Sequence, residues 1–518
     1  MPAVTVYDTT LRDGAQRAGL SFSVADKLRI ARRLDALGLP YIEGGWPGSN
    51  PKDVRFFAEL KRHPLRQARA VAFSSTRKAA TTVEADPTLR ALLEAETPAV
   101  AVFGKSWDYH AITALGTDLE ENLRMISESV AYLRRLGREV IFDAEHFFDG
   151  LRANPEYAWA TLRAAADAGA DWLVLCDTNG GSLPRVSAEA VREAARRFPG
   201  RRLGIHAHDD GGLAVANTLA AVEAGAVMVQ GTINGYGERC GNANLCTVIA
   251  DLELKLGRPC LPPGRLAELT AISHYVSELA NLPSADAQPY VGRNAFSHKG
   301  GVHVSALAKD PHLYEHVEPG SVGNERHVLV SELAGRSNLQ YRFNGSLSPA
   351  KAASLLELVK ARELEGYQYE GAEASLQLLV RDGVAPFELL GLRVLISGGG
   401  EAGTSIEASI KLRIGEKVVH TAAEGNGPVN ALDSALRKAL IEVHPEVTRV
   451  RLTDYKVRVL EGSDGTGARV RVLIESSDGE RVWGTVGVSP NIIEASWQAL
   501  ADSLVYYLTR DEGPSLPA

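Results

Sequence analysis

Eight short apolar runs of strand-type composition alternate with helix-type stretches over the first 257 residues. They cover residues 4–7, 41–43, 70–73, 99–103, 139–142, 172–175, 203–206 and 227–231. Eight strand–helix units in about 250 residues is the size of a closed (β/α)8 barrel. A doubly wound open sheet is the alternative, but no Gly-x-Gly-x-x-Gly motif follows the first strand. We therefore expect an α/β fold with a TIM barrel at residues 1–257.

Helix-type patterns fill the spaces between these runs, at residues 25–37, 119–136, 155–168, 188–198 and 212–224. Asn154-Pro155 shows how one of them begins, because a capping residue is followed by proline at the first helical position. Residues 258–385 are less regular, with helical patterns at 266–279 and 348–364. They are interpreted as helical linker subdomains that cover the mouth of the barrel.

Residues 386–518 contain one βββα pattern twice. Strand-type runs at 390–396, 405–414 and 417–423 precede a helix at 429–441, and runs at 450–460, 468–476 and 482–488 precede a helix at 491–508. The apolar positions of both helices follow helical spacing, which is typical of a packed core. Few acids, bases or nucleophiles cluster there, so this part is predicted to be a regulatory or associative domain.

The composition excludes several classes of protein. A net charge of −8 without a basic block argues against nucleic-acid binding. The four cysteines form no Cys-x-x-Cys pair and indicate reduced thiols in a cytoplasmic protein, with Cys240 expected to serve in packing. No signal peptide is visible, and no apolar stretch is long enough to span a bilayer.

His206 and His208 stand one residue apart at the end of the strand predicted at 203–206. Side chains two positions apart in an extended chain point to the same face. The two imidazoles can therefore aim at one point, which is how a strand end holds a divalent metal. The alternative is a pair of polar residues at a strand–loop junction, and the His-x-His pattern alone does not decide between them.

Residues with metal chemistry recur after other predicted strands. Asp13 follows the first strand, and Asn242 lies in the loop after the eighth. The carboxyl ends of barrel strands open at one rim, so residues more than 200 positions apart can meet there. Together with His206 and His208 they offer one carboxylate, two imidazoles and one amide oxygen, which suits Mn²⁺, Mg²⁺, Co²⁺ or Zn²⁺.

Four further residues are candidates for carbonyl chemistry. A metal would polarise the keto group of a 2-oxo acid, and Arg12 would donate to the same oxygen. Taken alone, Arg12-Asp13 is better interpreted as a surface salt bridge. Thr178 is either a ligand of the substrate carboxylate or part of a turn, and Glu145 is either an acid–base group or a solvated carboxylate. His303 is a candidate general base, but spacing alone favours a solvated loop histidine.

Four motifs together resemble those of the metal-dependent Claisen-condensing barrels, the family of 2-isopropylmalate, homocitrate and citramalate synthases. They are Leu11-Arg12-Asp13-Gly14-Ala15-Gln16, His206-Ala207-His208, Gly237-Glu238-Arg239-Cys240-Gly241-Asn242 and His298-Lys299-Gly300-Gly301-Val302-His303. The resemblance runs from about residue 4 to 510, and the duplicated C-terminal unit is similar to the family's allosteric domain. Segments 41–50, 143–150 and 335–338 are most similar to the citramalate synthase branch.

The resemblance implies roles for individual residues. It implies a metal site made by Asp13, His206, His208 and Asn242. It implies substrate-binding or catalytic roles for five more residues: Arg12 on the keto oxygen, Thr178 on the carboxylate, Glu145 near the reacting centre, and His303 and Tyr314 in acid–base chemistry. The chain departs from the family at Asp209, where asparagine is usual. The extra carboxylate would change local charge or metal preference without removing a ligand.

The reaction implied by the resemblance joins acetyl-CoA to pyruvate, giving citramalate and CoA on a route to isoleucine. A divalent metal is implied as cofactor, isoleucine as effector and a homodimer as the assembly. A 2-isopropylmalate or homocitrate synthase stays open, because one methylene changes binding by only about 1–3 kcal/mol. A lyase or aldolase would use the same metal–alkoxide state, although related lyases generally lack the duplicated domain. A third alternative is a non-catalytic amino-acid sensor, against which the intact set of site residues argues.

Overall fold

The computed structural model describes residues 3–510 except 332–334, 344–345, 382–384, 399–403, 461–464 and 466. The outermost residues of the predicted first and last domains, 1–2 and 511–518, lie outside this range. The chain forms two compact units, one made of Met1–Phe296 with Val317–Glu325 and the other of Ser297–His316 with Arg326–Ala518. The functional division at residues 257 and 385 stays a prediction.

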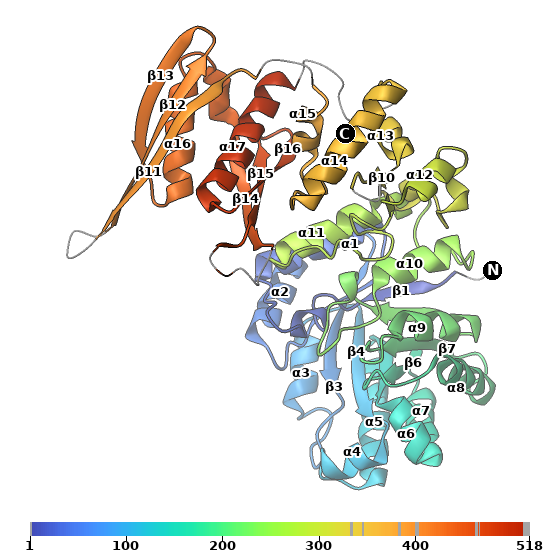
Figure 1. Ribbon diagram of the computed structural model, residues 1–518. Coiled ribbons are helices and arrows are strands. Elements are labelled where there is room, and N and C mark those ends of the chain that lie inside the picture. Colours follow the sequence, from blue (N-terminus) through green and yellow to red (C-terminus); the bar gives the residue numbers. More distant parts are fainter. Residues whose placement is uncertain are drawn as a thin grey trace. The chain divides into compact units, whose positions relative to one another are not determined.

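The first unit is a closed barrel of parallel strands in the order β1 to β8, with β8 paired to β1 (Figure 1). The strands are β1 (Thr5–Asp8), β2 (Tyr41–Gly45), β3 (Arg69–Ser75), β4 (Ala99–Lys105), β5 (Glu139–Glu145), β6 (Trp172–Asp177), β7 (Arg202–Ala207) and β8 (Met228–Gly231). All eight predicted strands are present, so the TIM-barrel prediction is confirmed.

Several strands continue past their predicted ends into polar sequence. Asp8 ends β1, Glu145 ends β5 and Asp177 ends β6, whereas the apolar patterns stop earlier. Asp8 and Asp177 are buried, and Asp143 inside β5 is buried as well. Hydrophobic patterning misses these positions because the barrel interior changes from apolar to polar toward the carboxyl ends of the strands.

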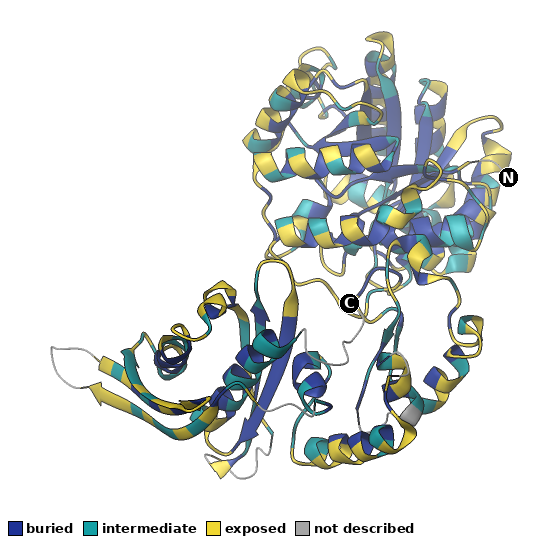
Figure 2. Ribbon diagram, turned by 90° about the horizontal axis from the view of Figure 1, so that it is seen from above, coloured by how far each residue is buried: buried dark blue, intermediate teal, exposed yellow. Residues whose placement is uncertain are grey.

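Helices surround the strands and turn their buried sides toward them (Figure 2). They are α1 (Val24–Leu37), α2 (Pro51–Arg62), α3 (Pro87–Glu94), α4 (Asp108–Thr113), α5 (Leu119–Arg135), α6 (Phe147–Ala153), α7 (Pro155–Asp167), α8 (Pro184–Arg197), α9 (Ala214–Glu223), α10 (Leu245–Leu254) and α11 (Leu269–Leu279). The Asn154 side chain accepts from the Tyr157 amide, which confirms the predicted start of α7. Helix α8 begins four residues before its predicted start, at Pro184.

The second unit contains short helices followed by two similar sheets. The helices are α12 (Gly301–Leu307), α13 (Arg336–Arg342), α14 (Pro349–Leu364) and α15 (Glu373–Leu378), and a two-stranded pairing joins β9 (Ser297–His298) to β10 (His327–Val328). The first sheet has β11 (Glu388–Gly398), β12 (Thr404–Ile414) and β13 (Lys417–Glu424), followed by α16 (Pro428–Leu440). The second has β14 (Arg451–Val459), β15 (Val470–Ser477) and β16 (Val482–Ser489), followed by α17 (Ile492–Thr509).

The predicted duplication is confirmed by sheet order and packing. Both sheets are antiparallel with their strands in chain order, and each has its helix packed on it. Leu432 and Leu436 of α16 and Trp497 and Leu500 of α17 lie in one hydrophobic core, as their spacing predicts. No helix among the described residues is both long and apolar enough to span a membrane.

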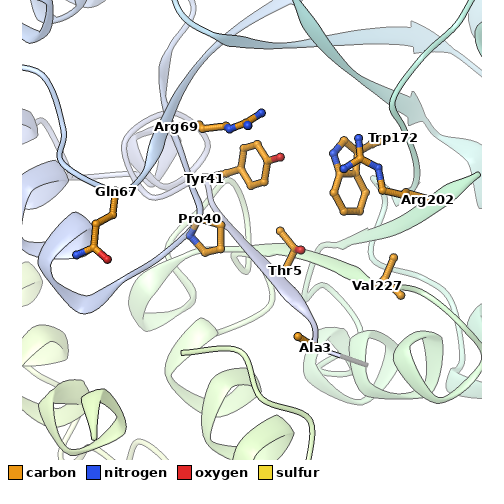
Figure 3. Close-up of a pocket in the computed structure, with 9 residues that line it drawn as sticks. All are labelled: Ala3, Thr5, Pro40, Tyr41, Gln67, Arg69, Trp172, Arg202 and Val227. Atoms are coloured by element: carbon orange, nitrogen blue, oxygen red, sulfur yellow. The ribbon is translucent and has the colours of Figure 1, made fainter. Parts of the chain in front are cut away.

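The amino ends of the barrel strands surround a shallow cavity of about 460 Å³ (Figure 3). Arg69, Tyr41, Trp172 and Arg202 line it, and the Arg202 guanidinium lies 4.2 Å from the centre of the Trp172 ring. All four side chains also converge on Glu139, which accepts from Tyr41 Oη at 2.9 Å, from Trp172 Nε1 at 3.1 Å and from Arg202 at 3.3 Å, and pairs with Arg69. Because Glu139 pairs with both guanidinium groups and Asp171 also lies 3.7 Å from Arg202, the two positive charges are compensated, and we interpret this end of the barrel as a structural closure.

Replacing Glu139 with alanine is expected to destabilise the barrel. Two guanidinium groups, a phenol and an indole would lose their shared acceptor, which costs about 2–3 kcal/mol of unfolding free energy. Urea denaturation of the full chain measures the change. Glu189→Ala is the control, because Glu189 makes only an exposed ion pair with Arg185 on α8. Equal stability of the two variants would contradict the closure role.

The second unit predicts a pH dependence of stability. Burial raises the pKa of Asp502 on α17 to about 6, although the Ser375 hydroxyl donates to its carboxylate. An acid with a raised pKa in the folded state binds more protons there than in the unfolded state, so its contribution to stability falls as the pH rises from about 4 to 6. Asp502→Asn is expected to raise stability at neutral pH by about 1–3 kcal/mol. Denaturation of both proteins at acidic and neutral pH tests this, since the gain should vanish in acid.

Candidate active site

Three side chains from distant parts of the chain converge at the carboxyl ends of the barrel strands. Asp13 lies after β1, His206 is on β7 and His208 directly follows β7. Their potential ligand atoms all lie within 4.8 Å of one another, with Asp13 Oδ2 at 3.3 Å from His206 Nε2 and 3.7 Å from His208 Nε2. All three side chains are buried, so this geometry can hold one divalent cation.

The electrostatics of the cluster favour a metal. Burial opposes ionisation of Asp13, but Arg12 and the two histidines hold its pKa well below the usual range. Burial lowers the pKa of His208 to about 4, which keeps that imidazole neutral near pH 7. Burial also acts to lower the pKa of His206, yet the hydrogen bond and charge of Asp13 raise it. A cation would replace the proton that Asp13 attracts to this site.

Asn242 completes the donor set. Its Nδ2 lies 3.1 Å from Asp13 Oδ2 and 3.2 Å from His206 Nε2, while its buried Oδ1 has no hydrogen-bond partner among the described residues. Turning the amide over would direct Oδ1 at a cation between these groups. A Cβ on Gly237 would stand 1.9 Å from Asn242 Oδ1, so only glycine leaves room for this amide. The residues therefore fit an oxygen–nitrogen metal site.

Arg12 is held beside the cluster by a buried carboxylate. Its Nε donates to Glu43 of β2, its Cζ lies 3.8 Å from the centre of the Phe73 ring, and its Nη1 lies 3.5 Å from Asp13 Oδ2. The side chain of Arg12 is 13% exposed and that of Asp13 is 3% exposed. The interpretation of this pair as a surface salt bridge is therefore wrong, and the guanidinium is fixed in place at the barrel mouth.

Glu145 and Thr178 lie at the ends of neighbouring strands. Glu145 pairs with Lys105, the residue opposite it at the end of β4. Thr178 follows β6, and its Oγ1 accepts from the His146 amide at 2.8 Å. A hydroxyl that accepts one hydrogen bond still has its own proton to donate. Thr178 can therefore donate to a carboxylate, as its predicted role requires.

Comparisons with known proteins identify the family of this chain. The HMGL-like family model matches residues 3–276, a homocitrate synthase post-HMGL domain-like model matches 290–361, and the LeuA allosteric (dimerisation) domain matches 370–508. The (R)-citramalate synthase of Synechocystis sp. is 54% identical over 525 residues, covering 97% of this chain and 96% of the relative. The chain belongs to the (R)-citramalate synthase family. The family member from Aquifex aeolicus is 52% identical and covers 98% of both chains, whereas the 2-isopropylmalate synthase of Shewanella amazonensis is 29% identical and covers 96% and 94%.

Asp209 in this member of the (R)-citramalate synthase family is directed at a helix. Its Oδ1 accepts from the Ala214 amide at 2.9 Å, at the first residue of α9. A carboxylate is favourable there, because backbone amides at a helix start carry partial positive charge. An asparagine side-chain oxygen can accept the same hydrogen bond, so the two residue types are interchangeable in this contact.

His303 and Tyr314 belong to the second unit. His303 is on α12, and its ring lies 4.2 Å from the Tyr314 ring in a stacked arrangement. Close by, Glu315 pairs with Arg326 at 2.5 Å and with His298 at 3.1 Å. The histidine and the tyrosine are thus neighbours within one unit, and their action on a substrate stays a prediction.

The sequence did not predict roles for several polar residues that lie below the mouth of the barrel. Tyr7 donates to Glu43 at 2.6 Å, and Gln230 of β8 links His206 to Asp143. Burial and the nearby Glu43 raise the pKa of Asp143 to about 7. The sequence signal that could have found Gln230 is a polar side chain inside an otherwise apolar strand, Met228–Gly231. Cys240 also differs from expectation, because it is exposed in the loop before Asn242.

Removing the carboxylate from the cluster is expected to abolish tight metal binding. In Asp13→Ala the two imidazoles would lose the only carboxylate of the cluster, so Mn²⁺ affinity should fall more than a hundredfold by calorimetry. Asp209→Asn is the matched control, because the hydrogen bond to α9 can be kept. Affinity unchanged in Asp13→Ala, or lost equally in both variants, would contradict the assignment.

Proposed function

We propose that this protein condenses acetyl-CoA with pyruvate to give (R)-citramalate and CoA. The observation that carries the proposal is the buried cluster of Asp13, His206 and His208 at the carboxyl ends of the strands, in a chain 52–54% identical to (R)-citramalate synthases over nearly its full length. The identity to the 2-isopropylmalate synthase is much lower, at 29%, so we propose pyruvate as the preferred 2-oxo acid.

Asp13, His206, His208 and Asn242 would hold a divalent cation, and Mn²⁺, Mg²⁺, Co²⁺ and Zn²⁺ all accept this mixture of oxygen and nitrogen donors. When bound, such a cation supplies Lewis-acid polarisation of the keto group. One carboxylate, one amide oxygen and two imidazole nitrogens make up this donor set, which contains no thiolate, so the chemistry of the donors favours a catalytic metal over a structural cysteine site.

Arg12 and Thr178 would orient the 2-oxo acid. Glu43 accepts a hydrogen bond from Arg12 Nε. The terminal nitrogens of the guanidinium would then donate to the keto oxygen as it becomes an alkoxide. The Thr178 hydroxyl would donate to the substrate carboxylate while it accepts from His146. Removing one such fixed donor typically costs about a hundredfold in rate or more.

Proton transfer requires a base for the methyl group of acetyl-CoA and an acid–base group for thioester hydrolysis. We assign these steps to Glu145, His303 and Tyr314. Lys105 pairs with Glu145, and the rings of His303 and Tyr314 are stacked on each other. The attack of the enolate carbon on the keto carbon forms the new C–C bond, and water then cleaves the thioester to release CoA.

The C-terminal unit is proposed to regulate the enzyme and to mediate a homodimer. The LeuA allosteric (dimerisation) match covers both βββα repeats, and isoleucine is the effector expected for a citramalate route. We place the enzyme in the cytoplasm, which fits three buried free cysteines and one exposed one.

The reaction is tested with a panel of 2-oxo acids. Purified protein with acetyl-CoA and Mn²⁺ should release free thiol most rapidly with pyruvate, more slowly with 2-oxobutanoate, 2-oxoisovalerate and 2-oxoglutarate, and the product should have the mass of citramalate. Arg12→Lys should lower kcat at least about a hundredfold, since lysine cannot keep the paired geometry with Glu43. Preference for another 2-oxo acid would reassign the substrate, and cleavage of citramalyl-CoA without condensation would establish a lyase.

A further inference from the structure

A buried chain of hydrogen bonds leads from the proposed metal site into the barrel. His206 Nδ1 lies 2.9 Å from Gln230 Oε1, and Gln230 Nε2 donates to Asp143 Oδ1 at 3.0 Å. Gln230 is 0% exposed and Asp143 is 4% exposed. The three side chains come from β7, β8 and β5, so only closure of the barrel brings them into line.

The orientation of the Gln230 amide decides the state of His206. With Oε1 facing the ring, Nδ1 must carry a proton to make the hydrogen bond, and Nε2 keeps its lone pair for a metal. With the amide turned over, its NH₂ group would face Nδ1, and the neutral ring would carry its proton on Nε2. That second state directs a hydrogen at Asp13 and Asn242 and cannot bind a cation through Nε2.

Asp143 discriminates between the two orientations. Above the raised pKa of Asp143, about 7, its carboxylate only accepts hydrogen bonds, so it draws the NH₂ group of Gln230 toward itself and leaves Oε1 for His206. The turned-over amide would place its oxygen against that carboxylate, and both groups are buried. The charge of Asp143 therefore fixes the orientation of the Gln230 amide, and that amide in turn fixes the proton of His206 on Nδ1.

We propose that Gln230 and Asp143 are positioning residues that hold His206 in the tautomer presenting Nε2 to the metal. The proposal rests on the metal site of the proposed function but not on its substrate. Removing such an outer partner of a metal-binding histidine typically costs 10–100-fold in metal affinity.

The test compares variants of Gln230 in the full chain. Gln230→Met keeps a similar volume but replaces the amide with a poor acceptor, and should weaken Mn²⁺ and Zn²⁺ binding by about 10–100-fold in calorimetry. Gln230→Glu combined with Asp143→Asn keeps an oxygen facing Nδ1 and an amide that can donate to it, so this double variant should bind within a few-fold of the parent protein. Asp143→Asn should lie between them, because an amide can face Gln230 with either its oxygen or its NH₂ group.

Nitrogen chemical shifts of ¹⁵N-histidine in the metal-free protein report the tautomer directly. In alkaline buffer His206, identified by the signal missing from His206→Ala, should carry its proton on Nδ1 in the parent protein and in the double variant Gln230→Glu, Asp143→Asn. Gln230→Met should show Nε2–H or a mixture. A role in packing alone would not move this signal.

Asn122→Leu is the matched control, because this amide is equally buried and bonds the Lys105 carbonyl and the Tyr157 hydroxyl instead. It should leave both metal affinity and the His206 tautomer unchanged. Parent-like affinity and an Nδ1–H signal in Gln230→Met would overturn the proposal. Parent-like behaviour of Asp143→Asn beside a weakened Gln230→Met would remove Asp143 from it. Loss of metal binding in Gln230→Met without thiol release by the parent protein would instead contradict only the proposed reaction.

Discussion

The structure depends on the burial of opposite charges where the barrel strands end. Arg12, Asp13, Glu43 and Asp143 lie within a few residues of these ends, and each is nearly removed from solvent. Buried charges persist only where partners compensate them. Glu43 compensates Arg12, and Arg12 together with the hydrogen bond to His206 compensates Asp13, so each charge is fixed in position by a partner. Because each of these side chains is held by its partner, the region is rigid, as the proposed binding of a metal and a 2-oxo acid requires.

The two ends of the barrel use charge differently. At the amino ends, Glu139 pairs with four donors, and its guanidinium partners Arg69 and Arg202 are about half exposed. At the carboxyl ends, Asn242 Oδ1 is left without a partner among the described residues and the acidic oxygen of Asp13 faces two imidazoles. A saturated acceptor stabilises a fold, whereas converging donor atoms with unused capacity mark a binding site. The amino ends of the strands thus stabilise the barrel, whereas the carboxyl ends carry the candidate active site.

Much of the fold was predictable because its signals are local. Eight apolar runs mark the eight strands, and the spacing of Leu432 and Leu436 marks α16 in the core. Local patterns did not predict the burial of residues whose environment is formed by distant parts of the chain. The strands run on through Asp8 and Asp177, where the closed barrel buries these carboxylates, and Cys240 lies in an exposed run of the loop, residues 238–240. Neither outcome is encoded in the few residues around it.

The sequence by itself determined which chemical groups are available: a carboxylate, a His-x-His strand end, an arginine and an amide, each placed after a strand of a barrel. The tertiary structure decided how they act. It brought Asp13 within 3.3 Å of His206, turned Asp209 toward α9, and aligned Gln230 and Asp143 behind the His206 ring. Strand periodicity specifies which face a side chain occupies, but the distances across a closed barrel follow from register and packing among all eight strands. Those are properties of the whole assembly of strands, so no single segment carries them.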